Sequence, residues 1–192
     1  MRYVPSPWLG LSGMTWGLWA LYWWYAARGA APAEKKESLA SRLAHIVPTV
    51  LCFLALFAPW AGLPVHAALY GRLSPLHPFG AAVTVAGALY MVWARVHLGR
   101  NWSAIVTLKE GHSLIRSGPY ALTRHPIYTG YILAFLGAVL ALGEWRGVFA
   151  LAALVATYWR KLHVEEEFLR SRFGEEYDRY RAEVKALVPF VV

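Results

Sequence analysis

Five stretches without Asp, Glu, Lys or Arg constrain the fold of this chain more than any other feature. They run approximately over Pro7–Ala27, Leu43–Pro64, Phe79–Ala94, Ile127–Gly143 and Gly147–Trp159. A bilayer core of ~30 Å needs about 20 helical residues, so the first two stretches are long enough to span it. The third is long enough if it begins near Leu73. The last two form a short hairpin that either spans where the bilayer thins locally or stops short of the far face. We therefore predict an all-α integral membrane protein with five transmembrane helices.

The composition supports a membrane setting. Charged residues make up only 16% of the chain, whereas a soluble domain has roughly 25%. The formal charge of +8 comes from basic residues in the segments between the apolar stretches, not from one basic face, so we expect no nucleic-acid partner. The single cysteine, Cys52, lies inside an apolar stretch. It excludes an intramolecular disulfide and a cysteine-based metal site, and we expect no metal.

The distribution of basic residues predicts the orientation. Lys and Arg number four, five and seven in three alternate segments between and after the apolar stretches, and only one in each of the other segments. Cytoplasmic segments carry the excess of Lys and Arg, so we expect the N-terminus outside and the C-terminus in the cytoplasm. This places the long loop before the fourth helix and the C-terminal tail in the same compartment.

The C-terminal tail is not a sixth span. From His163 to Leu187, acids and bases alternate with apolar or aromatic residues at intervals of three to five, which is typical of an amphipathic helix. Gly174 is expected to divide this helix in two, with acidic residues in the first turn of the second part. Pro189 is expected to end the second part. We thus predict cytoplasmic amphipathic C-terminal helices.

A first polar cluster precedes the fourth apolar stretch. Pro126 occupies the first position of the predicted helix, where its fixed φ is favourable. The amide groups at this helix N-terminus, beside Arg124 and His125, would attract an anionic group. The alternative is that the His-Pro pair only caps a helix.

A second polar cluster, from Arg160 to Glu167, follows the fifth stretch. Lys161 and Glu165 are four residues apart and therefore share a helix face. A cation and an anion side by side suit a zwitterionic ligand. The alternative is an ordinary charge run exposed to solvent.

The motifs of the two clusters occur in a fixed order. They are His112-Ser-Leu-Ile, Gly118-Pro-Tyr120, Arg124-His125-Pro126-Ile-Tyr128-Thr-Gly130, the apolar hairpin, and then Glu165-Glu166…Leu169…Phe173-Gly174-Glu-Glu-Tyr177…Tyr180…Pro189. In this order and at these spacings, residues 98–189 resemble the isoprenylcysteine carboxyl methyltransferase and phospholipid methyltransferase superfamily. The first three helices resemble it only in hydropathy.

The resemblance implies methyl transfer from S-adenosylmethionine to a lipophilic acceptor at the cytoplasmic face of the membrane. It also implies one membrane-embedded domain over residues 1–192, with three N-terminal helices in 1–96 and the cofactor-binding region in 97–192. The cofactor contacts carried over are His112, Ser113, Leu114, Ile115, Tyr120, His125, Pro126, Ile127, Tyr128 and Glu165. Glu165 would bind the ammonium of the cofactor, and the region of His125 its carboxylate or ribose.

The residues assigned to the acceptor depart from the pattern. A substrate-orienting arginine of the isoprenylcysteine enzymes corresponds to Lys161, which cannot grip a carboxylate with two parallel hydrogen bonds. We expect Lys161 and Arg160 to bind the acceptor, and Lys161 and Glu165 to act in catalysis. The acceptor itself stays open between an isoprenylated thiol-acid, an aminophospholipid head group and another small lipophile. Displacement at a sulfonium needs mainly positioning and desolvation.

Two other functions fit parts of the same pattern. Sterol reductases look similar over the C-terminal segment and use a nicotinamide cofactor, NADPH, although they are usually larger. An inactive structural membrane protein could also keep the fold. Binding of S-adenosylhomocysteine, of NADPH or of neither would separate the three hypotheses.

Overall fold

The structure, a computed structural model, describes residues 6–28, 35–58, 66–99, 102, 107–108 and 114–189. Its long helices are α1 Pro7–Ala27, α2 Leu39–Phe57, α3 Leu76–Leu98, α4 Pro126–Leu142 and α5 Trp145–Phe173. A 3-10 helix, η2 Gly118–Ala121, precedes α4, and α6 Glu175–Glu183 follows α5. Two short strands, β1 Lys35–Lys36 and β2 Thr107–Leu108, pair antiparallel.

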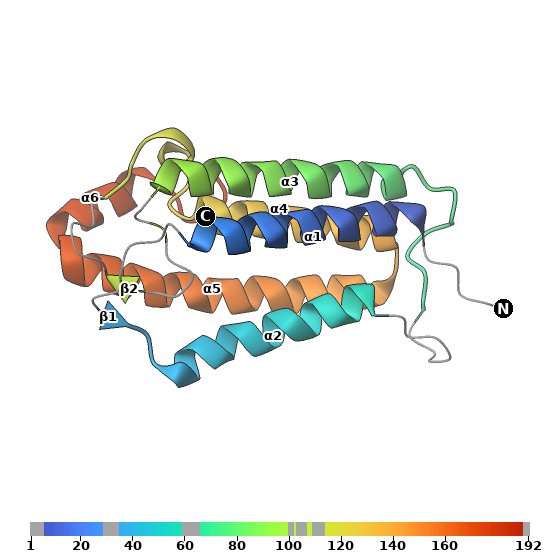
Figure 1. The fold of residues 1–192 in the computed structure, drawn as a ribbon, viewed down its shortest axis with the longest axis horizontal. Coiled ribbons are helices and arrows are strands. Elements are labelled where there is room, and N and C mark those ends of the chain that lie inside the picture. The colour runs from blue at the N-terminus through green and yellow to red at the C-terminus, as the bar shows by residue number, and fades with distance from the viewer. Residues whose placement is uncertain are drawn as a thin grey trace.

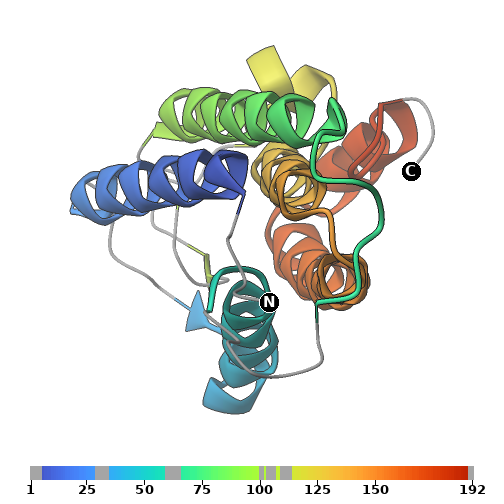
Figure 2. The same ribbon diagram turned by 90° about the vertical axis from the view of Figure 1, so that its right-hand side faces the viewer.

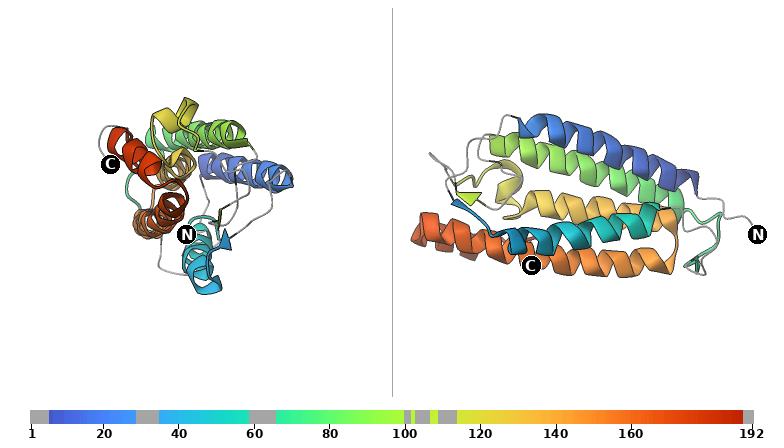
Figure 3. Two further views of the ribbon diagram at one scale, coloured as in Figure 1. Left: turned by 90° about the vertical axis from the view of Figure 1, so that its left-hand side faces the viewer. Right: turned by 60° about the horizontal axis from the view of Figure 1, so that its bottom comes forward.

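The five long helices lie side by side along the long axis of the molecule (Figure 1). The turn between α4 and α5 lies at one end, and η2 and α6 lie at the other. Seen end-on, α4 is surrounded by its neighbours, while α1 and α2 stand apart from each other (Figures 2 and 3). Helix α4 packs chiefly on α3, α1 packs on α3 and α4, and α2 packs on α5.

Glycines bring the backbones of α3 and α4 into direct contact. Gly80 and Gly87 in α3 face Gly130 and Gly137 in α4, and each pair is seven residues apart. A Cβ atom added to Gly137 would lie 2.3 Å from the backbone nitrogen of Thr84. Small residues at a helix contact are typical of membrane proteins, where close packing replaces the hydrophobic effect. This contact fixes α4 at the centre of the bundle and thereby fixes the position of its first turn.

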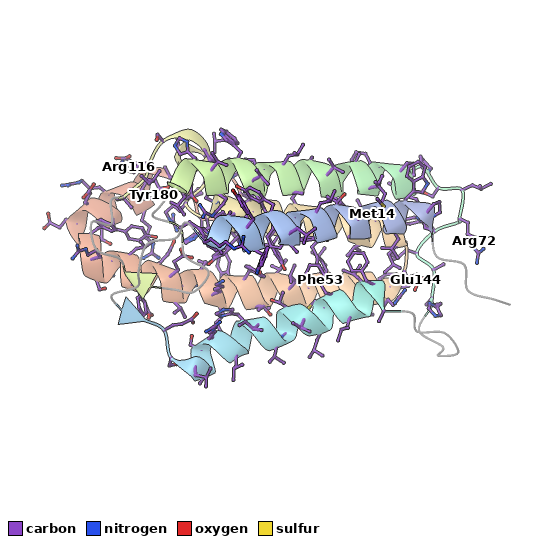
Figure 4. The ribbon with its side chains drawn as sticks, in the orientation of Figure 1. Met14, Phe53, Arg72, Arg116, Glu144 and Tyr180 are labelled. Atoms are coloured by element: carbon purple, nitrogen blue, oxygen red, sulfur yellow. The ribbon has the colours of Figure 1, made fainter. Side chains whose placement is uncertain are left out.

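Large apolar side chains cover the outside of the bundle. Met14, Leu51 and Phe149 are 67%, 59% and 70% exposed, and Figure 4 shows Met14 on α1. Within the described residues, α2 and α3 are long and apolar enough to cross a membrane, and α4 is a shorter apolar helix. An apolar surface of this extent is typical of a protein surrounded by lipid.

Each predicted apolar stretch coincides with one long helix, but several boundaries were wrong. Helix α2 begins at Leu39 and ends at Phe57, before the predicted end, and α5 continues without a break through the polar cluster to Phe173. Gly174, with a φ of +52°, separates α5 from α6 as predicted. The prediction that the second tail helix extends to Pro189 was wrong, because α6 ends at Glu183. The carbonyl groups after it bind the loop before α4 instead of continuing a helix.

Candidate functional site

A cavity of about 430 Å³ lies between α1, α2, α4 and α5, at the end of the bundle that carries α6. Its walls combine charged, aromatic and apolar side chains from both halves of the sequence. The lining residues are Trp19, Trp23, Arg42, His45, Ile46, Thr49, Val50, Leu98, Trp102, Leu114, Ile115, Tyr120, Arg124, His125, Pro126, Ile127, Tyr128, Tyr131, Tyr158, Lys161, Glu165, Phe168, Leu169, Tyr177 and Tyr180.

The first turn of α4 and the polar end of α5 meet inside this cavity. The Tyr128 hydroxyl donates a hydrogen bond of 2.5 Å to a Glu165 carboxylate oxygen. The ring of His125 stacks on that of Tyr128, with centroids 5.4 Å apart and planes 2° from parallel. His125 Nδ1 also lies 3.7 Å from the Glu165 carboxylate. Pro126 starts α4 and so sets the direction in which Tyr128 points.

Lys161 lies in the same cavity, one helical turn before Glu165. Its Nζ is 5.3 Å from the ring centroid of Tyr128 and 5.8 Å from that of Tyr158, within the range of a cation–π interaction. The four-residue spacing therefore predicted correctly that Lys161 and Glu165 face one space. The Lys161 ammonium, with its three N–H donors, therefore lies against aromatic faces inside the cavity.

Arg160 lies elsewhere. It is exposed, and its guanidinium donates to the backbone carbonyl of Ser41 at 3.4 Å and to the Ser41 hydroxyl at 3.3 Å. It is not among the residues that line the cavity. Consecutive helical residues point about 100° apart, so Arg160 faces the start of α2, and its assignment to the acceptor stays a prediction.

A buried ion pair underlies the cavity. Arg124 contacts Glu166 through Nη2 at 2.6 Å and Nε at 2.8 Å, and His125 Nε2 lies 3.2 Å from the same oxygen. Burial alone would raise the pKa of Glu166, which lies beyond the apolar part of α5, but the hydrogen bonds and charges of His125 and Arg124 outweigh it and lower the pKa to about 2. Glu166 is therefore ionised at neutral pH and orients the His125 ring against Tyr128.

Glu166 was missed as a site residue. The run Glu165-Glu166-Glu167 looks uniform in sequence, yet Glu165 faces the cavity, Glu166 is buried and Glu167 is exposed. The solvent-exposed alternative thus holds for Glu167 and is wrong for Glu166. The sequence did contain a signal for a buried acid. Arg124 lies next to the His-Pro pair, and a buried arginine needs an acidic or hydrogen-bonding partner.

The tail closes the site from the side of α4. The backbone amides of Arg124 and His125 donate to the carbonyls of Lys185 and Ala186 at 2.8 Å and 3.0 Å. The tail therefore occupies these two amides, and the predicted anion site stays a prediction for the amides that follow them in the first turn of α4. A ligand in the cavity therefore has other groups than these two amides as its partners.

Most of the predicted cofactor residues gather around the cavity. Leu114, Ile115, Tyr120, His125, Pro126, Ile127, Tyr128 and Glu165 all line it, whereas His112 and Ser113 lie outside the described residues. The Tyr180 hydroxyl donates to the backbone carbonyl of Tyr120 at 2.6 Å and fixes η2 beside α6, at the end of the bundle where Figure 4 labels Tyr180. The roles of these residues stay predictions.

The wall formed by α1 and α2 was not predicted. Trp19 and Trp23 of α1 stack with centroids 4.7 Å apart, and Trp102 packs edge-on against Trp23 at 5.4 Å. His45 of α2, buried to 6% exposure, adds a polar group to this wall. Hydropathy predicts that such helices meet lipid, but it does not reveal which of their faces lines a cavity. Within the described ranges, no group of His, Cys, Asp and Glu is arranged to hold a metal ion.

Comparisons with known proteins give the family of the chain and relatives of similar sequence. The profile of the phospholipid methyltransferase family matches residues 76–176. The protein-S-isoprenylcysteine O-methyltransferase of Schizosaccharomyces pombe is 32% identical over 101 residues, covering 51% of this chain and 43% of that protein. Protein-S-isoprenylcysteine O-methyltransferase B of Arabidopsis thaliana is 28% identical over 116 residues, covering 59% of each chain.

A solved structure shares the fold. It is that of a eukaryotic intramembrane Ras methyltransferase, an isoprenylcysteine carboxyl methyltransferase, with a TM-score of 0.57 and 24% identity. The similarity covers 82% of this chain and 55% of that chain. The chain spans about half the length of the curated relatives it matches, between 43% and 59% in the two named above.

Proposed function

This chain belongs to the phospholipid methyltransferase family, and on that premise we propose that it transfers a methyl group from S-adenosylmethionine to a lipophilic acceptor. The observation that carries the proposal is the Tyr128–Glu165 hydrogen bond inside the cavity. It joins the two segments that the resemblance assigns to the cofactor, although they are far apart in the sequence. S-adenosylmethionine supplies an activated methyl group when bound.

The protein contributes position and charge to this reaction. Glu165 would hold the ammonium of the cofactor, because it is the ionisable acid that lines the cavity, and Tyr128 and His125 fix its carboxylate. Lys161 would face the acceptor across the same space. Exclusion of water from the cavity would strengthen these charge interactions. Binding of both reactants in one cavity would align the methyl donor with the acceptor.

The acceptor would arrive from the lipid. The cavity wall includes Trp19 and Trp23 of α1 and Ile46 and Val50 of α2, and these two helices stand apart in the end view (Figure 2). An apolar wall that begins beside a charged pocket suits a molecule with a hydrocarbon chain and a polar head. The names of the relatives favour an isoprenylcysteine-like carboxylate, and a lipid head group is the alternative.

The proposed membrane placement follows the basic residues. Five spans would place the N-terminus outside and the end with Arg116 and Tyr180 in the cytoplasm (Figure 4). In that orientation the cavity opens toward the compartment that supplies a water-soluble cofactor. The apolar part of α5 would lie in the bilayer, and its polar end from Arg160 to Phe173 would extend beyond it.

Replacement of Glu165 by Gln tests the cofactor assignment. The amide keeps the size of the side chain but loses the negative charge, so the affinity for S-adenosylhomocysteine should fall by ~1–3 kcal/mol, the loss typical of a charged hydrogen bond. Isothermal titration calorimetry on the full chain in lipid nanodiscs measures this. Glu167→Gln is the matched control, since Glu167 lies two residues away on the same helix and is exposed. Equal affinities for wild type and Glu165→Gln would remove the assignment.

Two further measurements test the reaction itself. Radiolabelled S-adenosylmethionine, supplied with N-acetyl-S-farnesylcysteine in one reaction and phosphatidylethanolamine nanodiscs in another, should label one of the two acceptors. A thermal shift with S-adenosylhomocysteine, and none with NADPH, is also expected. Stabilisation by NADPH alone would replace the proposal with a reductase.

A further inference from the structure

A second concavity, of about 340 Å³, lies on another face of α5. Its walls include Trp159, His163, Arg181 and Lys185. The first cavity meets α5 at Tyr158, Lys161 and Glu165, whereas this cleft meets it at Trp159, Leu162, His163 and Glu166. The cleft is therefore separate from the proposed cofactor site, although the Arg124–Glu166 pair forms a wall between them.

The charge of the cleft is positive. Glu166 is its acidic residue, and two contacts from Arg124 already neutralise it. Arg181, which also pairs with Glu166 at 3.6 Å, and Lys185 are both exposed. Three basic side chains, Arg124, Arg181 and Lys185, thus face one carboxylate, and the cleft keeps a net positive charge. His163 uses Nδ1 on the carbonyl of Trp159 at 2.7 Å, which leaves Nε2 as its outward-facing atom.

The cleft also lies at the polar end of an apolar surface. Trp159 ends the last apolar stretch, is 42% exposed, and packs against His163 with ring centroids 5.2 Å apart. One face of α5 exposes Ala152, Ala156 and Trp159. His163 follows Trp159 by four residues and therefore lies on the same face. Tryptophan at this depth is typical of the border between acyl chains and head groups.

We propose that this cleft binds the phosphate head group of an anionic lipid from the cytoplasmic leaflet, with an acyl chain lying along the exposed face of α5. The inference rests on the membrane placement given under the proposed function and not on methyl transfer. Basic pockets at this depth attract acidic head groups, and each Lys or Arg near the surface contributes to the attraction. A zwitterionic head group has no net charge and would leave the excess positive charge of the cleft uncompensated.

A lipid bound in the cleft would raise the affinity of the neighbouring cavity for the cofactor. The Lys185 backbone carbonyl accepts the hydrogen bond of the Arg124 amide, and Arg181 is next to Glu166. A phosphate bound between Arg181 and Lys185 would therefore fix the tail against the loop that carries His125. Lipid binding and cofactor binding would then favour each other through one shared segment.

Native mass spectrometry of the full chain, titrated with phosphatidylglycerol or phosphatidylcholine in detergent, tests the proposal. We expect wild type to retain phosphatidylglycerol in preference, and Lys185→Glu to weaken that binding about ten-fold. The matched control is Arg172→Glu, an exposed residue of α5 that does not line the cleft; it should change the affinity less than two-fold. Millimolar inorganic phosphate should not displace the lipid.

Three results would overturn the inference. Equal losses of phosphatidylglycerol affinity in Lys185→Glu and Arg172→Glu would show that the lipid is attracted only by the overall charge of the protein. Equal retention of phosphatidylglycerol and phosphatidylcholine would show no head-group preference. Displacement by inorganic phosphate would assign the cleft to a free anion. None of these measurements depends on the methyl acceptor, so cofactor binding by the same sample tests the proposed function separately.

Discussion

The two ends of the helix bundle both bury a carboxylate beside an arginine, yet they differ in what surrounds the pair. At the end with the α4–α5 turn, where Figure 4 labels Glu144, the Glu144 carboxylate contacts Arg146 at 2.7 Å and His66 at 3.2 Å. Arg146 also donates to the backbone carbonyl of Ala55 at 2.8 Å. At this end, contacts within the protein therefore connect α2, the residue His66 before α3, and the α4–α5 turn.

At the opposite end, the Arg124–Glu166 pair lies between two cavities. Beside it, Glu165 and Lys161 line the first cavity; the Glu165 carboxylate contacts Tyr128 and His125, and Lys161 lies against aromatic rings. The same residue types therefore serve stability at one end and leave binding capacity at the other. A buried ion pair thus marks a site only when neighbouring charges have room for a ligand.

Arg124→Ala is expected to have the largest effect on stability. It would leave Glu166 as a buried charge without its main partner, which typically costs about 3–5 kcal/mol. Denaturation in a mixed micelle, followed by circular dichroism, measures the loss. Arg116→Ala removes a basic residue from the exposed ion pair with Glu183 and should cost less than about 1 kcal/mol. Similar losses in the two variants would show that the buried pair is not special.

Glu144→Gln should have an intermediate effect, and on stability only. Loss of the charge weakens the contacts of Arg146 and His66 and should destabilise the protein by about 1–3 kcal/mol. The affinity for S-adenosylhomocysteine should stay within two-fold of wild type, in contrast to Glu165→Gln. A large loss of cofactor affinity in Glu144→Gln would show that the two ends are coupled.

Acidification from pH 5 to pH 3 should have the smallest effect on the stability of the fold. The pKa of Glu166 is lowered from 4.5 to about 2, so the ionised form is stabilised in the folded protein. Its contribution to the free energy of unfolding is fully present above about pH 4.5 and is lost as the pH falls toward 2. The difference in melting temperature between wild type and Glu166→Gln should therefore shrink as the pH falls from 5 to 3. A constant difference would contradict the assigned pKa.

The helices were predictable from the sequence because exclusion of charge is a local property of each stretch. The shared face of Lys161 and Glu165 was predictable for the same reason, since helical periodicity decides it. The pairing of Tyr128 with Glu165 was expected only through the family resemblance. It depends on how α4 and α5 pack, and no local pattern contains that information.

The rest depends on tertiary contacts. Glu166 could not be distinguished from Glu165 and Glu167 without the position of Arg124. The faces of α1 and α2 that line the cavity could not be selected, because both helices are apolar over most of their surface. The irregular tail after α6 was mistaken for a helix because its residues continue an amphipathic pattern while its backbone bonds to another segment.

The tail after α6 acts on α4 through its backbone. The carbonyls of Lys185 and Ala186 accept main-chain amides, and the carbonyl of Leu187 accepts the Thr129 hydroxyl at 2.7 Å. Carbonyl groups are common to all residue types, so these hydrogen bonds constrain the length of the segment, while the burial of Ala186 and Leu187 constrains its side chains. Insertion or deletion of one residue between Gly174 and Lys185 would shift every one of these acceptors out of register, whereas a substitution at an exposed position there, such as Arg179, would leave them in place.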